Sequence, residues 1–193
     1  MSELHLDFES RSVFDLKSGG AYPYAQHPST RVLCASFAVD DGAPRTWIPG
    51  DPTPPEIIQA VAEGWHIVCH NAAFERALWA GVLTPRHGWP APALSQFRCT
   101  AAMAAAMSLP RDLARAAQVT GQPAQKDDEG KKVMLKMCKP RKLTYSSDEL
   151  EARHKKAPPI TRQIDNGEDP VNERYELEGG GVVAVTWWHT PDL

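Results

Sequence analysis

The chain has 193 residues, of which 42% are hydrophobic and 23% charged, so it is large enough for one globular domain with an appendage and too apolar for a disordered chain. Its net charge of −3 does not indicate a nucleic-acid-binding protein. No apolar run approaches the ~18 residues that span a bilayer. Met1–Glu9 lacks the basic segment that begins a signal peptide. The four cysteines form no C-x-x-C pair, which argues against a zinc ribbon and predicts reduced thiols in a cytoplasmic protein without membrane contact.

The apolar periodicity predicts strands and helices that alternate along the chain. In chain order they are a strand at 4–9, a hairpin of strands 31–39 and 45–49 that turns at 40–42, a helix at 54–64, a strand at 65–69, a helix at 72–83, and two helices within 100–119. Pro110 separates the last two, because an interior proline breaks a helix. This order predicts an α/β fold in which helices flank a mixed sheet.

The composition changes near residue 142. Residues 1–142 hold 16 Lys and Arg against 14 Asp and Glu, whereas residues 143–193 hold 5 against 10 and are rich in Pro and Gly. We therefore predict a domain at 1–142 and a divergent acidic tail at 143–193. Within the tail, a capping box at Ser146 predicts a short helix to about Lys156, and the apolar residues 182–188 predict a strand without indicating what it packs against.

Two acids are spaced for one face of the first strand. Asp7 and Glu9 are two residues apart, so their side chains point the same way, and carboxylates that share a face repel unless a cation lies between them. Such hard oxygen ligands suit Mg²⁺ or Mn²⁺. The alternative is a solvated face of an edge strand.

A third acid follows the strand at 65–69. Asn71 can cap the helix that begins at Ala72, and Glu75 lies in its first turn, at a strand-to-helix junction of the kind where α/β sheets gather ligands. The alternative is that Glu75 only interacts favourably with the helix dipole.

The combination of these segments resembles a known family. Leu6-Asp7-Phe8-Glu9 resembles the first motif of the DEDD (DnaQ-like) 3′–5′ exonucleases, and His70 to Arg76 resembles their second motif, Asn-x-x-x-(Asp/Glu). The segments 20–28, 32–34 and 125–141 look like the exonuclease domain of phage-type family A DNA polymerases, so that the resemblance covers about residues 4–142.

The resemblance implies a ribonuclease-H-like fold and phosphodiester hydrolysis by two metal ions, Mg²⁺ or Mn²⁺. Asp7 would bridge both ions, Glu9 would bind the ion that holds the attacking water, and Glu75 would bind the second. Asn71 would brace the junction or touch the terminal nucleotide, and Phe8 would place its backbone or ring beside the terminal base. The expected partners are a single-stranded DNA 3′ end and a DNA polymerase, in a bacterial or phage-infected cell.

The family's third motif, Tyr-x-x-x-Asp or His-x-x-x-x-Asp, is not found in this chain. Tyr145 is followed four residues later by Glu149, and the other tail positions fit no better. We therefore expect the 193-residue chain to be weakly active or inactive. The open alternatives are a catalytically impaired remnant that binds nucleic acid or a polymerase, and a relative that acts on RNA.

Three further features have ordinary structural interpretations beside functional ones. The run 126–142 holds seven Lys and Arg against three acids, so Lys131, Lys132 and Lys136 are candidate phosphate contacts or a solvated face. The pair Trp187-Trp188 fits core packing or a base-stacking surface. His66 and His70, four residues apart on one strand, are expected to be structural rather than ligands.

Overall fold

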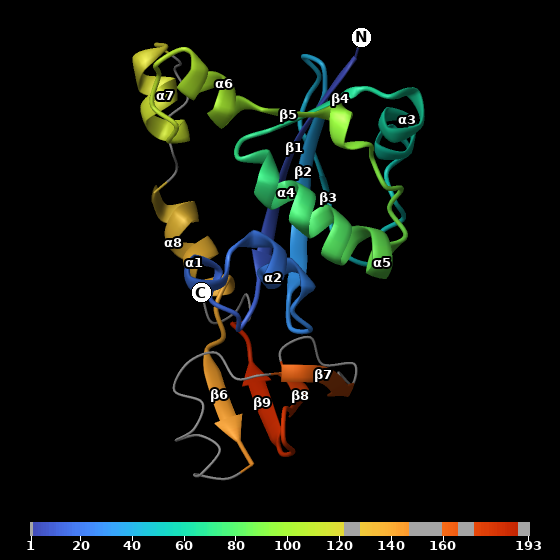
Figure 1. Ribbon diagram of the computed structural model, residues 1–193, viewed down its shortest axis with the longest axis vertical. Coiled ribbons are helices and arrows are strands. Elements are labelled where there is room, and N and C mark those ends of the chain that lie inside the picture. The colour runs from blue at the N-terminus through green and yellow to red at the C-terminus, as the bar shows by residue number, and fades with distance from the viewer. Residues whose placement is uncertain (1, 122–127, 147–159, 166–171, 189–193) are drawn as a thin grey trace. The chain divides into compact units, whose positions relative to one another are not determined.

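Figure 1 presents a computed structural model of the chain, which describes residues 2–121, 128–146, 160–165 and 172–188. The chain forms two compact units, one of Met1–Glu9 with Val32–Asp127 and one of Ser10–Arg31 with Asp128–Leu193. Among the described helices, none has the length and hydropathy needed to cross a membrane. The domain boundary predicted after residue 142 stays a prediction. In the structure, residues 10–31 pack with the C-terminal part of the chain.

A five-stranded mixed sheet forms the first unit, and β1 and β2 continue from it into the second unit. Its order is β3-β2-β1-β4-β5, with parallel pairs β1–β4 and β4–β5 and an antiparallel pair β2–β3. The strands are β1 (Glu3–Arg11), β2 (Arg31–Val39), β3 (Arg45–Trp47), β4 (His66–Cys69) and β5 (Phe97–Cys99). The predicted α/β class is confirmed, and the sheet is compatible with the predicted ribonuclease-H-like fold.

Helices follow the strands of this sheet in the predicted order. They are α3 (Pro55–Glu63), α4 (Ala72–Leu78), the π-helical turn η1 (Trp79–Leu83), α5 (Thr84–His87), the 3₁₀ turn η2 (Leu94–Gln96), α6 (Thr100–Ala106) and α7 (Leu113–Val119). Gly64 ends α3 at φ 72°, a left-handed conformation that a residue without Cβ adopts at little cost. The predicted break between α6 and α7 is confirmed, whereas the predicted helix at 72–83 is α4 followed by the π-helical turn.

The core of the first unit is aromatic. Phe8, on the inward face of β1, packs edge-on against Trp79 at 6.2 Å and Trp89 at 6.0 Å between ring centroids. Trp47 completes the cluster at 5.0 Å from Trp89. All four side chains are at most 4% exposed. Burial of such rings is worth about 1.5–3 kcal/mol each, so this cluster fixes which face of β1 is left for solvent.

A second, four-stranded antiparallel sheet with order β6-β9-β8-β7 lies in the other unit. The elements of this unit are α1 (Leu16–Gly19), α2 (Ala21–Gln26), α8 (Asp128–Met137), β6 (Lys142–Tyr145), β7 (Ile160–Asp165), β8 (Asn172–Leu177) and β9 (Val182–Thr186). The strand predicted within 182–188 is confirmed, and it pairs with β6 and β8. Gly179, Gly180 and Gly181 turn the chain between β8 and β9 at φ 81°, 95° and 95°, values that other residues rarely adopt. The predicted helix at 147–156 lies outside the described residues.

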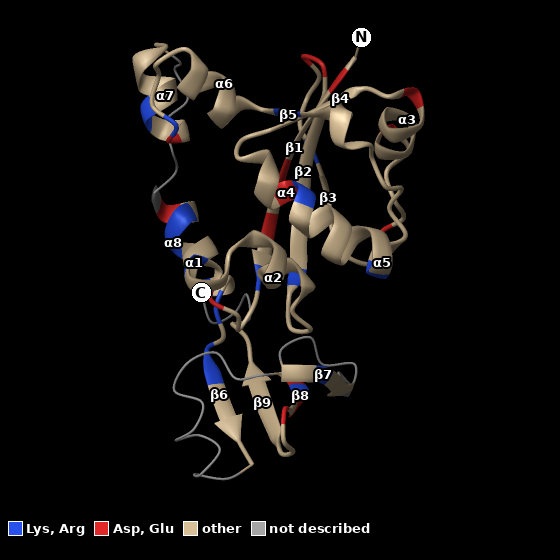
Figure 2. Cartoon of the chain, viewed as in Figure 1, with Lys and Arg blue, Asp and Glu red and all other residues tan. Residues whose placement is uncertain are grey.

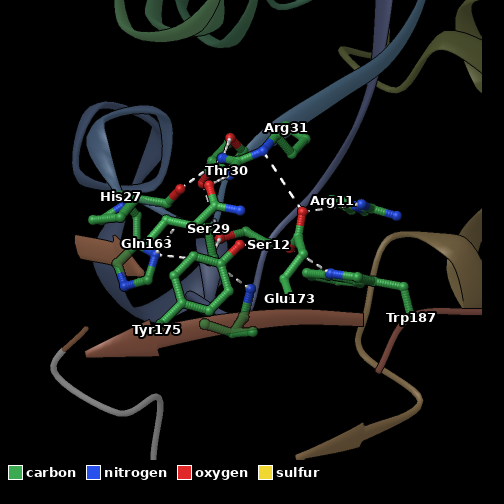
Figure 3. A network of polar contacts seen from close by, with 12 residues as sticks. Arg11, Ser12, His27, Ser29, Thr30, Arg31, Gln163, Glu173, Tyr175 and Trp187 are labelled. Carbon is green, nitrogen blue, oxygen red and sulfur yellow. Dashed lines mark hydrogen bonds and ion pairs between the residues drawn. The ribbon is translucent and has the colours of Figure 1, made fainter. Parts of the chain in front are cut away.

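Buried polar side chains tie the ends of β1 and β2 to this sheet (Figure 3). Glu173, on the inward face of β8 and 4% exposed, accepts hydrogen bonds from the Tyr175 hydroxyl at 2.5 Å and from Trp187 Nε1 at 2.6 Å. The same carboxylate pairs with Arg11 at 3.3 Å and Arg31 at 3.8 Å. A buried charge is tolerated when it is paired and hydrogen-bonded in this way, so Glu173 is a structural part of the unit.

Candidate functional site

Asp7 and Glu9 lie together on the outward face of β1. The residues of this strand alternate, with Leu4, Leu6 and Phe8 buried and the intervening side chains more exposed. Asp7 is exposed and Glu9 is half-buried. The predicted shared face of the two carboxylates is therefore confirmed, and acidic colour follows β1 in Figure 2.

Glu75 is the buried acid of the first unit. It lies on α4, one turn after the strand-to-helix junction, with only 3% of its surface exposed. Its Oε2 atom is buried without a hydrogen-bond partner among the described residues. An ionised carboxylate in this position lacks the compensation that buried charges normally have, which favours either a proton or a cation beside it.

The three carboxylates share one electrostatic environment. Although part of the Asp7 side chain is exposed, partial burial of its carboxyl raises the pKa, and the nearby His70 partly offsets this. Burial, and then the charge of Asp7, raise the pKa of Glu9. Burial raises the pKa of Glu75 to about 7, the Glu75 backbone N–H opposes the change, and Asp7 adds to it. Asp7 thus acts on both other acids, as expected for like charges that crowd one site.

An open groove lies beside Asp7. It has a volume of about 380 Å³ and is lined by Asp7, Ser36, Phe37, His70, Thr100 and Leu113, among others. That volume lies at the small end of the ~300–1,000 Å³ typical of ligand sites. The lining therefore combines apolar surface with one carboxylate.

His70 borders both the groove and Asp7. Its Nε2 donates to the Arg111 carbonyl at 2.8 Å, and its Nδ1 lies 2.9 Å from Thr100 Oγ1. Both ring nitrogens are therefore held by the protein, in agreement with the predicted structural role. The sequence reasoning did not place this ring beside Asp7, where its charge lowers the pKa of the carboxyl.

Asn71 occupies the predicted cap position but does not cap the helix with its side chain. Its backbone is left-handed, with φ 67°, and its side chain is exposed. The Cys99 thiol accepts hydrogen bonds at the start of this helix instead. Burial alone would raise the pKa of the Cys99 thiol, but backbone N–H groups that include those of Asn71 and Ala72 outweigh burial and lower it. The sequence carried no signal for this long-range contact.

The other predicted contact residues lie in different surroundings. The Phe8 ring is in the aromatic core, on the face of β1 opposite the acids, so only its backbone remains for the predicted contact with a base. Lys131, Lys132 and Lys136 are exposed on α8, in the second unit. No three His, Cys, Asp or Glu side chains gather closely enough to hold one metal ion within the described part of the chain. The ligand roles of Asp7, Glu9 and Glu75 therefore stay predictions.

Comparison with known proteins gives one informative relationship. No family model matches the chain. The chain is 32% identical over 152 residues to a DNA polymerase of Bacillus phage SP02. This chain is related to a phage DNA polymerase. The match covers 74% of the chain but 22% of the polymerase, so the chain spans about a fifth of that relative's length.

Proposed function

We propose that this chain is a proofreading-type 3′–5′ exonuclease domain that hydrolyses DNA phosphodiesters by a two-metal mechanism. The observation that carries the proposal is the pairing of Asp7 and Glu9 on the outward face of β1 with the partnerless, buried carboxylate of Glu75. The sheet order and the similarity to part of a phage DNA polymerase support it.

The acids fit a divalent cation on chemical grounds. Glu75 Oε2 lacks a partner among the described residues, and crowding by Asp7 raises the pKa of both neighbouring acids, so a positive charge here would relieve two penalties. Carboxylate oxygens are the ligands that Mg²⁺ and Mn²⁺ prefer. Asp7, Glu9 and Glu75 would hold the two ions, which would supply an activated water and charge stabilisation for the leaving oxygen.

The surrounding residues would bind and orient the 3′ end. The groove beside Asp7 would take the terminal nucleotide, with the apolar lining against the base. His70, fixed by Thr100 and the Arg111 carbonyl, would keep the orientation of this wall. Asn71 is exposed at the start of α4, where its side chain is free of the capping bond and would contact the nucleotide.

The lysines of α8 would contribute phosphate contacts. Lys131, Lys132 and Lys136 are exposed, and each contact with a single strand contributes about −0.7 to the slope of log K against log salt. The relative is a whole DNA polymerase, so a polymerase is the protein partner that we propose for this chain.

A second candidate is a remnant that binds nucleic acid or a polymerase without hydrolysis. Two observations favour it. The third motif of the exonucleases is not found in the sequence, and no group of three metal-binding side chains forms among the described residues. Loss of a ligand would weaken the site most for the ion that holds the attacking water.

The deciding experiment is digestion of a 5′-labelled single-stranded oligonucleotide by the full chain with Mg²⁺, with Mn²⁺ and with EDTA. The exonuclease proposal expects slow, cation-dependent shortening from the 3′ end that Asp7→Ala abolishes and the exposed-acid control Asp41→Asn retains. Thermal stabilisation by Mn²⁺ that depends on Asp7, without shortening, would support the remnant. Shortening that persists at the same rate in Asp7→Ala would contradict both.

A further inference from the structure

Trp188 has a different environment from its neighbour Trp187. Trp187 is fully buried, with its Nε1 on Glu173, whereas Trp188 is partly exposed just beyond the end of β9. Successive side chains of an extended segment point to opposite sides, so one tryptophan serves the core and the other faces outward. Core packing therefore accounts for the position of Trp187 but not for that of Trp188.

Two cations from different elements meet at the Trp188 ring. Lys136, in the last turn of α8, places its Nζ 5.7 Å from the ring centroid. Arg141, just before β6, places its Cζ 5.3 Å from the same centroid. An aromatic ring attracts cations to its face, so the three side chains form one mixed aromatic and basic surface, which we name the Trp188 platform.

The backbone holds this platform in place. The Arg141 N–H donates to the Thr186 carbonyl at 2.8 Å, and Lys142 pairs with Thr186 in the β6–β9 register. Trp188 follows Thr186 by two residues, so its backbone and that of Arg141 both adjoin the paired ends of β6 and β9. A fixed ring loses little freedom when a ligand stacks on it, which is the advantage of preorganisation.

The segment that carries Lys136 and Arg141 is basic. Residues 130–146 contain six Lys and Arg and no Asp or Glu, and Figure 2 shows blue on α8 and at the start of β6. One of these cations, Lys139, lies near Asp15, where it contributes to lowering the pKa of that carboxyl, so we leave it out of the platform. The remaining cations make the surface suited to a polyanion.

We propose that the Trp188 platform binds single-stranded nucleic acid, with one base stacked on the Trp188 ring and the flanking phosphates on Lys136 and Arg141. Flat rings interleaved with cations are the recurring chemistry of such sites, because bases stack and phosphates pair. Bases in a duplex are paired and cannot stack on a side chain, so the platform selects single strands. The proposal rests on the proposed function, to which it adds a second contact for the strand.

Binding is measured without hydrolysis, by fluorescence anisotropy of a fluorescein-labelled oligothymidylate with the full chain in EDTA. Trp188→Ala is expected to raise Kd by about 5- to 150-fold, the range for loss of one stacked base, and Trp188→Phe by no more than about twofold. Lys136→Gln with Arg141→Gln is expected to flatten the salt slope by about 1.4. The matched controls are Tyr22→Ala, an aromatic 48% exposed on α2, and Arg162→Gln, an exposed cation on β7.

Wild-type affinity in a folded Trp188→Ala protein would overturn the platform, as would an equal loss for duplex and single-stranded DNA. Binding of phosphatidylserine vesicles that depends on Trp188, with unchanged oligonucleotide binding, would assign the surface to membranes and overturn it too. Circular dichroism verifies folding, and Trp188→Phe tests the ring if Trp188→Ala does not fold. The two proposals can fail separately. If the chain shortens DNA and its binding does not depend on Trp188, only the platform proposal is contradicted. If binding depends on Trp188 and the chain does not shorten DNA, only the exonuclease proposal is contradicted.

Discussion

Replacing Glu75 with Gln tests whether this carboxylate is buried at a cost to stability. Burial and then Asp7 raise its pKa to about 7, against 4.5 for the unfolded chain, with the Glu75 backbone N–H opposing the change. The folded protein therefore binds this proton more tightly than the unfolded chain does. The difference of about 2.5 pKa units corresponds to an upper bound of about 3 kcal/mol, at about 1.4 kcal/mol per unit.

The sign of the pH dependence follows from the raised pKa. Below about pH 4.5 the group is protonated in both states, so its contribution to stability is fully present. As the pH rises through about 7 the folded carboxyl must ionise while buried, and that contribution is lost. Glu75→Gln is neutral at every pH, so it should be more stable than the wild type by about 1–3 kcal/mol at pH 8 and close to it near pH 4.5.

Thermal unfolding followed by circular dichroism measures this difference. For a chain of this size about 1 kcal/mol shifts Tm by about 2–4 °C, so the expected gain at pH 8 is about 2–12 °C. Asp41→Asn, which removes an exposed acid in the same unit, should change Tm little at either pH. A Glu75→Gln protein that is less stable at pH 8, with the pH dependence of the wild type, would refute the burial argument.

A metal titration extends the same experiment. If a cation neutralises Glu75, Mn²⁺ at about 100 times its Kd should stabilise the wild type by about 2.7 kcal/mol at pH 8. The Glu75→Gln protein should lose most of this stabilisation while keeping its higher Tm without metal. Equal stabilisation of both proteins would separate Glu75 from the cation site and leave only Asp7 and Glu9 as its ligands.

Two more predictions concern residues that are strained or buried. Glu173→Gln should lower the free energy of unfolding by about 2–4 kcal/mol in urea titrations, because it removes the buried negative charge that faces Arg11 and Arg31. Glu176→Gln breaks only an exposed pair and should cost less than about 1 kcal/mol. Equal effects would mean that the buried cluster contributes no more than the exposed pair. Asn71 has a left-handed backbone with φ 67°, so Asn71→Gly should keep the wild-type free energy of unfolding and Asn71→Val should lower it by about 1–2 kcal/mol. A Val variant as stable as the wild type would show that the helix start relaxes out of the left-handed region.

The sequence was sufficient for the elements whose periodicity is local. Alternation predicted both the strand and the outward face that carries Asp7 and Glu9, and Gly64 and Pro110 predicted where helices end or break. These signals depend on neighbours in the chain, so they survive without knowledge of the tertiary fold. β5 was missed because Phe97–Cys99 has three residues, too few for any period to be recognised.

The second sheet could not be predicted, and β8 shows why. Its buried positions are Glu173, Tyr175 and Leu177, so an acid occupies a place where an apolar residue would have completed the alternation. The partners that make this acid acceptable, Arg11 and Arg31, are 162 and 142 residues away in the sequence. The contact between the Cys99 thiol and the backbone N–H groups at the start of α4 is a similar case, since only the fold brings them together.

The pairing of Arg11 shows that alternation along a strand does not by itself decide which partner a side chain takes. Arg11 follows Glu9 by two residues, so alternation alone would put a guanidinium beside that carboxylate on the same face. Arg11 pairs instead with Glu173 and stacks on Trp187 at 4.5 Å. Burial, and then the charge of Asp7, raise the pKa of Glu9. The C-terminal sheet, which looked like a separate tail in the sequence, therefore supplies the buried partner of an arginine near the N-terminus.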